Sequence, residues 1–189
     1  MSTASTPGTS HSHDVGHNVS DGVSDGGEHR QHLWSMIKDI RFCMFTYSAN
    51  DGDLHARPMT TQNKAIDEDA SLWFFMPRQS EPVAALAGQP VVNVAYADTG
   101  ADRYVSVSGT AAVVNDLAKA RQLWSKMAEA WFPGGVEDPN LALIQVQIRH
   151  ANYWDVKSSK LVQLFKMAKA SVTGEPPTDL GEHAEIRMR

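Results

Sequence analysis

Two arginines and a serine in the first half of the sequence have the chemistry needed to hold an anion. Arg57 lies in one extended run, and Arg78 and Ser80 follow closely after a second run. Because side chains alternate along a strand, His55, Arg57 and Met59 should share one face. Ser80 stands where a helix is expected to begin, and the free N–H groups and positive dipole end of a helix start favour an anion. The sequence therefore predicts a phosphate site walled by the aromatic residues of the second run.

Each of these residues also has an ordinary structural interpretation. Arg57 and Arg78 could pair with surface carboxylates, and His55 could be a solvated histidine rather than a proton donor. The aromatic residues 73–75 and Trp131 could belong to the core, as large apolar side chains usually do. Residue types alone therefore leave both interpretations open.

No other arrangement of residues indicates catalysis or metal binding, so the catalytic residues are unknown and no metal site is expected. The sequence has no Ser-His-Asp set, no clustered carboxylates, no P-loop and no glycine-rich dinucleotide fingerprint. The single cysteine, Cys43, excludes an intrachain disulfide and favours a buried, inert thiol. His11, His13 and His17 lie on a segment without preorganised geometry for a metal. Any chemistry must come from a bound group.

Composition narrows the class of protein. A chain of 189 residues with 42% hydrophobic content fits one globular domain. The net charge of -5 argues against binding to nucleic acid or to an acidic membrane through bulk charge. No run of 18 apolar residues and no charged, apolar leader occurs, so a cytoplasmic location is expected, with no membrane partner.

The chain divides into three parts. Residues 1–27 are rich in His, Ser and Gly and predict a disordered tail. Residues 28–174 should form the folded domain, and 175–189 a C-terminal extension. Within the domain, periodicity and turn residues predict the following elements. Helices are expected over 28–40, 81–87, 117–131 and near 161–170, and strands over 41–48, 54–60, 71–76, 90–97, 103–114, 143–149 and 152–156.

Strands that outnumber short, irregularly placed helices favour an antiparallel barrel or sandwich over a doubly wound sheet. Pro58 cannot donate to a sheet ladder, so its strand should lie at an edge. The run Ser71–Met76 is apolar on both faces. One face should meet the core, and the other should meet either a second layer or a flat ligand.

Six sequence motifs in order resemble the general stress protein 26 group of the flavin-binding split barrels related to pyridoxamine 5'-phosphate oxidase. The resemblance spans roughly residues 28–174. The motifs are HARPM (55–59), LWFFMPRQS (72–80), PVVNVAYAD (90–98), VSVSGTAAVVND (105–116), WFPGGVEDP (131–139) and NYWD (152–155).

This resemblance implies a mainly β protein, a six-stranded antiparallel split β-barrel with flanking helices. It also implies a homodimer with one FMN in each of two clefts at the subunit interface. The phosphate would be held around Arg78, and a rigid aromatic wall would come from the facing subunit. The cofactor-binding residues that the family implies are His55, Arg57, Pro58, Met59, Phe74, Phe75, Met76, Arg78, Gln79, Ser80, Trp131, Phe132 and Pro133.

Two departures from the family pattern qualify these expectations. Relatives usually carry a Lys two residues after the serine, where this chain has Pro82, and the loss of that cation leaves room for FAD. The Arg and His of the oxidase's substrate motif are missing after Tyr153–Trp154, where Lys160–Gln163 stand instead. Oxidation of a B6 vitamer is therefore not expected.

Three functions remain open at this point. The first is a flavin-dependent oxidoreductase of unknown substrate, which is the general stress protein interpretation. The second is a protein that binds or stores flavin without turnover. The third is a split-barrel module for haem, for which only His55 and His150 offer candidate axial ligands.

Overall fold

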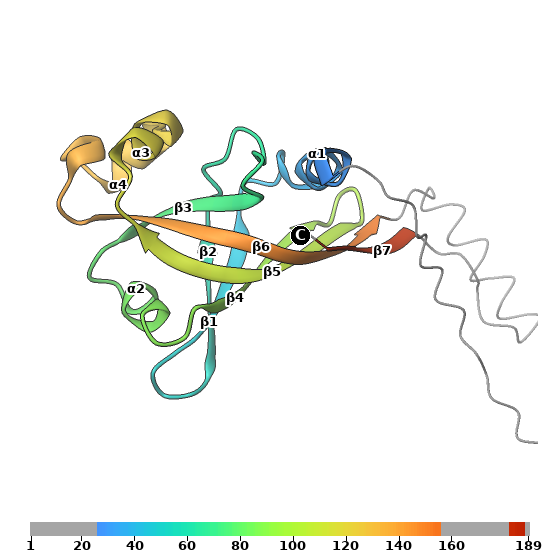
Figure 1. The fold of residues 1–189 in the computed structure, drawn as a ribbon, viewed down its shortest axis with the longest axis horizontal. Helices are drawn as coiled ribbons and strands as arrows, with labels where there is room; N and C mark the ends of the chain where they lie inside the picture. Colours follow the sequence, from blue (N-terminus) through green and yellow to red (C-terminus); the bar gives the residue numbers. More distant parts are fainter. Residues whose placement is uncertain (1–25, 156–181, 188–189) are drawn as a thin grey trace, which may run out of the picture.

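The fold is one curled antiparallel sheet with short helices on both faces (Figure 1). The computed structural model describes residues 26–155 and 182–187. Six strands follow the order β2-β1-β4-β5-β6-β3, and β7 adds to β6. The strands are β1 (Cys43–Ser48), β2 (Leu54–Met59), β3 (Ser71–Pro77), β4 (Val91–Asp98), β5 (Arg103–Val114), β6 (Leu141–Asp155) and β7 (Glu182–Arg187). The helices are α1 (Gly26–Ile37), α2 (Glu81–Leu86), α3 (Leu117–Leu123), α4 (Lys126–Trp131) and the 3-10 turn η1 (Gly135–Glu137). The predicted six-stranded antiparallel half-barrel is confirmed.

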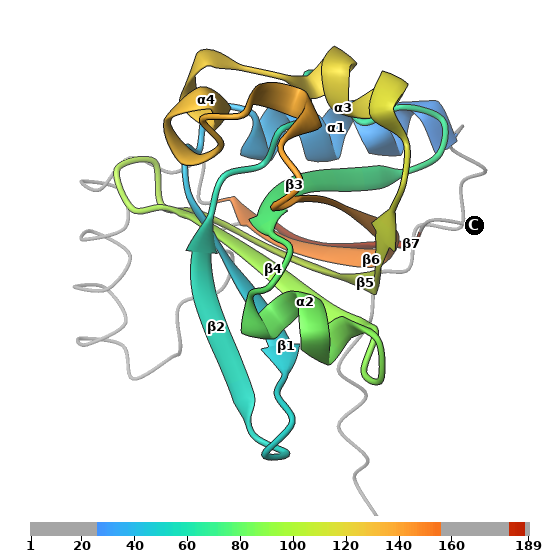
Figure 2. The same ribbon diagram turned by 90° about the vertical axis from the view of Figure 1, so that its left-hand side faces the viewer.

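A hairpin joins β1 to β2 and extends away from the helices at the top of the barrel (Figure 2). Its turn is closed by the Ala49 amide on the Asp53 carbonyl at 2.8 Å, and Gly52 takes the positive φ of 90° that favours glycine. β2 forms one end of the strand order, as the proline at position 58 predicts.

The sheet curls until the chain that follows β2 reaches the outer edge of β3. The Gln62 amide donates to the Trp73 carbonyl at 2.9 Å, and the Trp73 amide donates to Oδ1 of Asn63 at 2.7 Å. These bonds cover only the first half of the β3 edge. Among residues 26–155, no backbone group bonds to the second half of this edge, toward Pro77.

The concave face of the sheet encloses the main core. Its largest fully buried side chains include Phe45, Tyr47, Phe74 and Met76. Helix α2 packs against β1 and β5, and α1 also packs against β5. Cys43 is buried in this core, so the predicted burial of the thiol is confirmed, and burial raises its pKa to about 11.

A second, smaller core lies on the opposite face of β3. Trp73 and Phe75 pack there with Leu123 of α3, Ala128 of α4 and Phe132. The run 71–76 therefore meets a second protein layer on its other face.

The prediction of a single helix over 117–131 is wrong. The chain forms α3 and α4 instead, because Trp124 leaves the helical region with ψ at 138° and the hydroxyl of Ser125 then caps α4 by accepting from the Ala128 amide. The break turns α4 so that Ala128 faces the second core while Trp131 faces outward.

The two strands expected over 143–149 and 152–156 are one strand, β6. Its pairing with β5 shifts between the Ser108–His150 and Gly109–Ile148 pairs, so Arg149 is an extra residue in β6. The bulge reverses the alternation: Ile148 and Ala151 are both buried, although they lie three residues apart. That reversal made one strand look like two.

Several expected segments lie outside the described residues: positions 1–25 of the predicted tail 1–27, the helix near 161–170 and the motif Lys160–Gln163. The last two positions of that predicted tail, Gly26 and Gly27, begin α1 instead. In the described ranges, no helix is long and apolar enough to cross a membrane.

Candidate functional site

The predicted Arg57 side chain lies on the concave face at the β2 edge, where it meets the start of α2. Arg57 is opposite Phe45 of β1, and His55 is opposite Tyr47, so both share the inward direction of these core residues. An Nη atom of Arg57 donates to Oε2 of Glu81 at 2.9 Å. The strand therefore brings its guanidinium to a carboxylate rather than leaving it open.

His55 completes the cluster around Glu81. Its Nδ1 lies 3.0 Å from Oε1 of Glu81, and its Nε2 lies 3.2 Å from Oδ2 of Asp51. Both carboxylate oxygens of Glu81 are thus engaged, one by His55 and one by Arg57. The imidazole therefore lies between two carboxylates.

Tyr47 adds a buried hydroxyl to the same region. Within the described part of the chain, its oxygen has no hydrogen-bond partner. Burial lowers the pKa of Arg57, but the oxygens of Tyr47 and Glu81 outweigh this effect and raise the pKa overall. Arg57 therefore stays charged, and the Tyr47 hydroxyl lies close enough to contribute to that effect although it makes no full hydrogen bond among the described residues.

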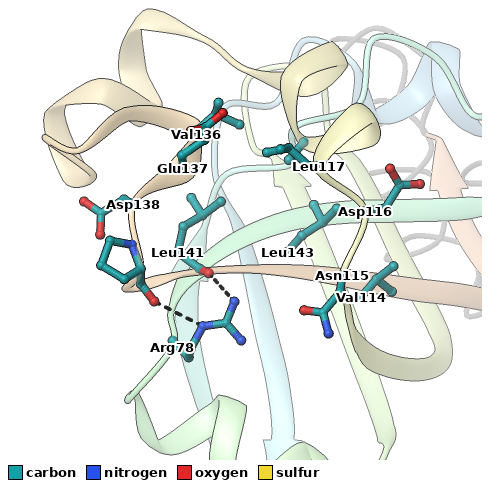
Figure 3. Close-up of a pocket in the computed structure, with 12 residues that line it drawn as sticks. Arg78, Val114, Asn115, Asp116, Leu117, Val136, Glu137, Asp138, Leu141 and Leu143 are labelled. Atoms are coloured by element: carbon teal, nitrogen blue, oxygen red, sulfur yellow. Dashed lines mark hydrogen bonds between the residues drawn. The ribbon is translucent and has the colours of Figure 1, made fainter.

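Arg78 does not join this cluster. Its Nε donates to the Pro139 carbonyl at 3.2 Å, and an Nη atom donates to the Leu141 carbonyl at 2.7 Å (Figure 3). It therefore fastens the turn before β6 to the end of β3. No contact in the described ranges joins Arg78 to Arg57, and the two predicted phosphate cations have separate partners.

Arg78 also lines a cavity of about 330 Å³ between the start of α3 and the turn that contains η1 (Figure 3). Its floor is apolar, with Leu141 and Leu143. The carboxylates on its rim are already bonded: Asp116 accepts from the Lys119 amide, and Asp138 accepts from the Asn140 amide. The cavity therefore offers shape and apolar surface but few free polar groups.

The junction between β3 and α2 carries polar groups that lack partners. Ser80 is the N-cap residue of α2, as predicted, but its hydroxyl makes no capping bond. That oxygen is buried and unpaired among the residues that the structure describes. Gln79 beside it is exposed, and Pro82 is buried in the first turn of α2, so no cation replaces the expected Lys.

The backbone of Phe75 is the second unpaired group at this junction. The Ile148 amide donates to the Ala70 carbonyl, and the Arg78 amide donates to the Asn140 carbonyl. These two bonds show which residues of β3 direct their backbone groups toward β6. By alternation, Phe75 and Trp73 face the opposite edge. Trp73 is bonded there, but nothing within residues 26–155 bonds the amide or carbonyl of Phe75.

The side chains of Phe74, Phe75 and Met76 are all buried in the two cores of the chain. A ligand at the β3 edge could therefore meet their backbone but not their rings. Met59 is half-buried against the main core, and Pro58 is exposed on the other face of β2.

The predicted aromatic wall divides into exposed and buried parts. Trp131 is 76% exposed, and Pro133 is also exposed. Phe132 is buried in the second core, where it packs edge to face against Phe75. Of these three residues, Trp131 and Pro133 are therefore the ones exposed at the surface.

On the convex side of the barrel, the surface over β2, β1, β4, β5 and β6 lacks charged residues, whereas the same rows continue along β7 as Glu185 and Arg187. Two rows of outward residues cross β2, β1, β4, β5 and β6 in register, and none of them is Asp, Glu, Lys or Arg. We call these ten residues the outer sheet face: Pro58, Met44, Ala95, Ser106 and Asn152 in one row, and Ala56, Thr46, Asn93, Ser108 and His150 in the other.

The haem interpretation finds little support in the geometry. His55 is held between two carboxylates, and His150 lies on the outer sheet face. The described ranges contain no group of three or more His, Cys, Asp or Glu residues that could hold a metal ion.

Glu81 and Tyr47 are the residues that sequence reasoning missed. Glu81 directly follows Ser80, and an acid in the first turn of a helix proposed to hold an anion was a usable signal. Tyr47 gave no such signal, because its position beside Arg57 depends on the pairing of β1 with β2.

The curled sheet and the β3–α2 junction define a split barrel in which part of the β3 edge has no backbone partner among residues 26–155. The model of the family described as "Pyridoxamine 5'-phosphate oxidase like" matches residues 28–178. The chain belongs to this family, and the resemblance inferred from the six motifs is confirmed.

Relatives of this chain include general stress proteins. The general stress FMN/FAD binding protein from Xanthomonas citri is 34% identical, with a TM-score of 0.61, over 70% of this chain and 92% of that protein. A Jannaschia sp. CCS1 structure assigned to general stress protein 26 is 25% identical, with a TM-score of 0.66, over 86% of this chain and 99% of that one. Protein bli-3 of Neurospora crassa is 27% identical over 77% of this chain and 74% of its own length.

Proposed function

We propose that this chain binds a flavin nucleotide at the β3–α2 junction and acts as a flavin-dependent oxidoreductase. The observation that carries the proposal is the set of unpaired polar groups there: the Phe75 backbone and the Ser80 hydroxyl. A flavin nucleotide presents hydrogen-bonding ring atoms and a phosphate. These are the partners that such a strand edge and hydroxyl lack. The Xanthomonas citri relative, described as FMN/FAD binding, supports the same ligand class.

The residues have separate tasks in this proposal. The free edge of β3 at Phe75 orients the ring through backbone bonds, and Ser80 with Arg57 holds the phosphate. Arg78 keeps the edge in place by fastening it to the turn before β6. When bound, the flavin supplies the redox chemistry, since the described ranges offer no set of side chains that could do so.

A second copy of the chain completes the site in this proposal. The outer sheet face has no formal charge if His150 is neutral, whereas a solvated face of an antiparallel sheet normally carries charged residues. Depletion of charge is typical of the centre of a protein interface. The exposed Trp131 supplies a flat apolar surface of the kind that subunit contacts bury.

Light scattering after size exclusion tests the homodimer. Ala95 and Ser106 lie side by side near the middle of the outer sheet face. Ala95→Arg should shift the protein toward monomer, because it places a charge in the interface. Ala118→Arg, on the exposed side of α3, is the matched control and should leave the mass unchanged. A dimer that survives Ala95→Arg would place the interface elsewhere.

Ligand release tests flavin binding. The purified protein should release a yellow compound on heating, with the absorbance and mass of FMN or FAD. FMN added to the apoprotein should lose fluorescence. Absence of both signals would rule out the proposal.

Turnover is tested separately, because binding without turnover is the alternative. The holoprotein should oxidise NADH or NADPH faster than the same concentration of free flavin. A rate equal to that of free flavin would leave a protein that binds or stores flavin.

A further inference from the structure

The anion site that the sequence predicts already contains an anion of the protein itself. Arg57 and His55 of β2 hold the two carboxylate oxygens of Glu81, at 2.9 and 3.0 Å. Glu81 belongs to α2, 24 positions after Arg57 in the chain, so only the fold brings them together.

The charge of this cluster is not positive. Arg57 faces two carboxylates, those of Glu81 and Asp51, which His55 bridges. If His55 is neutral, the four groups carry a net charge of -1. A phosphate entering here gains one guanidinium that is already paired and meets two negative charges.

The position of Glu81 places its carboxylate next to the site proposed for the phosphate. It is the residue after Ser80, whose unpaired hydroxyl is the other group proposed to hold the phosphate. A phosphate on Ser80 and Arg57 would therefore lie beside the Glu81 carboxylate. Pro82, the next residue, supplies no compensating charge.

We propose that Glu81 sets the ligand preference of this site by competing with the flavin phosphate for Arg57. The proposal rests on the proposed flavin site. The terminal phosphate of FMN carries nearly two charges at pH 7, whereas riboflavin carries none and each phosphate of FAD carries one. Glu81 therefore disfavours FMN relative to riboflavin and FAD.

The expected change in FMN affinity follows from the solvent exposure of the Arg57 and Glu81 side chains. The side chains of Arg57 and Glu81 are 45% and 41% exposed, so their ion pair is of the weak, partly solvated kind. A phosphate can displace it, at a cost to affinity of up to about fivefold. The phosphate of FMN should thus add little to the affinity that riboflavin already has.

Fluorescence titration of riboflavin, FMN and FAD tests this in the full chain. In the native protein, FMN should bind no more than about threefold more tightly than riboflavin. Glu81→Gln and Glu81→Ala should each raise FMN affinity by up to about fivefold, raise FAD affinity less, and leave riboflavin unchanged. Glu68→Gln, on an exposed turn, is the matched control and should change none of the three.

A double variant localises the effect. In an Arg57→Ala background, Glu81→Gln should give a smaller gain in FMN affinity, because there is no guanidinium left to release. The same gain with and without Arg57 would overturn the competition and leave only general repulsion.

The outcomes separate the two proposals. If riboflavin and FMN bind, but their affinity ratio is the same in the native protein and both Glu81 variants, the role of Glu81 is wrong and the flavin site stands. If no flavin binds to any variant, the flavin site itself is wrong.

Discussion

Phe75 of β3 and Phe132, just after α4, lie edge to face, with ring centroids 6.4 Å apart and ring planes at 76°. This contact joins the helical layer to the outer side of β3, so the aromatic residues of both motifs belong to a core within one chain. What remains for a ligand at Phe75 is its backbone edge.

Replacing the two neighbouring aromatics should therefore have different effects. Phe132→Ala should lower the free energy of unfolding by about 3 kcal/mol, because it leaves a cavity in the second core. Trp131→Ala should change it by less than about 0.5 kcal/mol, because the side chain is 76% exposed. Urea denaturation measures both, and equal losses would contradict this division.

The two arginines should also separate by experiment. Arg78→Ala should cost about 1 to 2 kcal/mol of stability, because two carbonyls lose a charged donor. Arg57→Ala should cost less than about 1 kcal/mol, because its ion pair is largely solvated. It should instead weaken FMN binding. Thermal denaturation and FMN titration of both variants check the division, which would be wrong if Arg78→Ala weakened binding without loss of stability.

Gly109 is required by close packing between β5 and β6. A Cβ at this position would lie 2.2 Å from the carbonyl oxygen of Gln147 and 3.1 Å from Cγ1 of Val146. Gly109→Ala should therefore destabilise the protein by about 3 kcal/mol, since the main chain must move. Gly88→Ala is the control, because a Cβ there meets nothing within 4 Å. Its denaturation midpoint should stay unchanged or rise slightly.

Stability should fall at alkaline pH because of Cys43. Burial raises its pKa from 9.0 to about 11, so the native state keeps a proton that the unfolded chain loses. The stabilisation is complete below pH 9 and is lost as the pH rises toward 11, with about 1 kcal/mol gone by pH 10. Tyr96, whose pKa burial also raises, adds to the loss above pH 10.

Urea titrations at pH 8 and pH 10 measure this loss. Cys43→Ala should lower stability at both values but reduce the difference between them. An unchanged difference would mean that the thiol does not cause the alkaline loss.

Local patterns were sufficient for most of the fold. Sequence patterns predicted the strands β1 to β6 but not β7, the Asn-Asp-Gly turn predicted the hairpin, and Pro58 predicted the edge position of β2. Ser80 was predicted correctly as the N-cap residue of α2. The errors came where a single residue interrupts a period: Ser125 splits a helix, and Arg149 is the extra residue that shifts the phase of β6.

The composition of the candidate site was likewise visible in the sequence, but its connections were not. Arg57, Arg78 and Ser80 were identified by type and spacing alone. Which carboxylate meets Arg57 depends on α2 folding back against β1, and Arg78 finds its carbonyls only because β3 pairs with β6. Side-chain chemistry is a local property that the sequence states directly. The partner of each charge is a long-range property, and only the curl of the sheet decided that Arg57 faces Glu81 while Arg78 holds a turn.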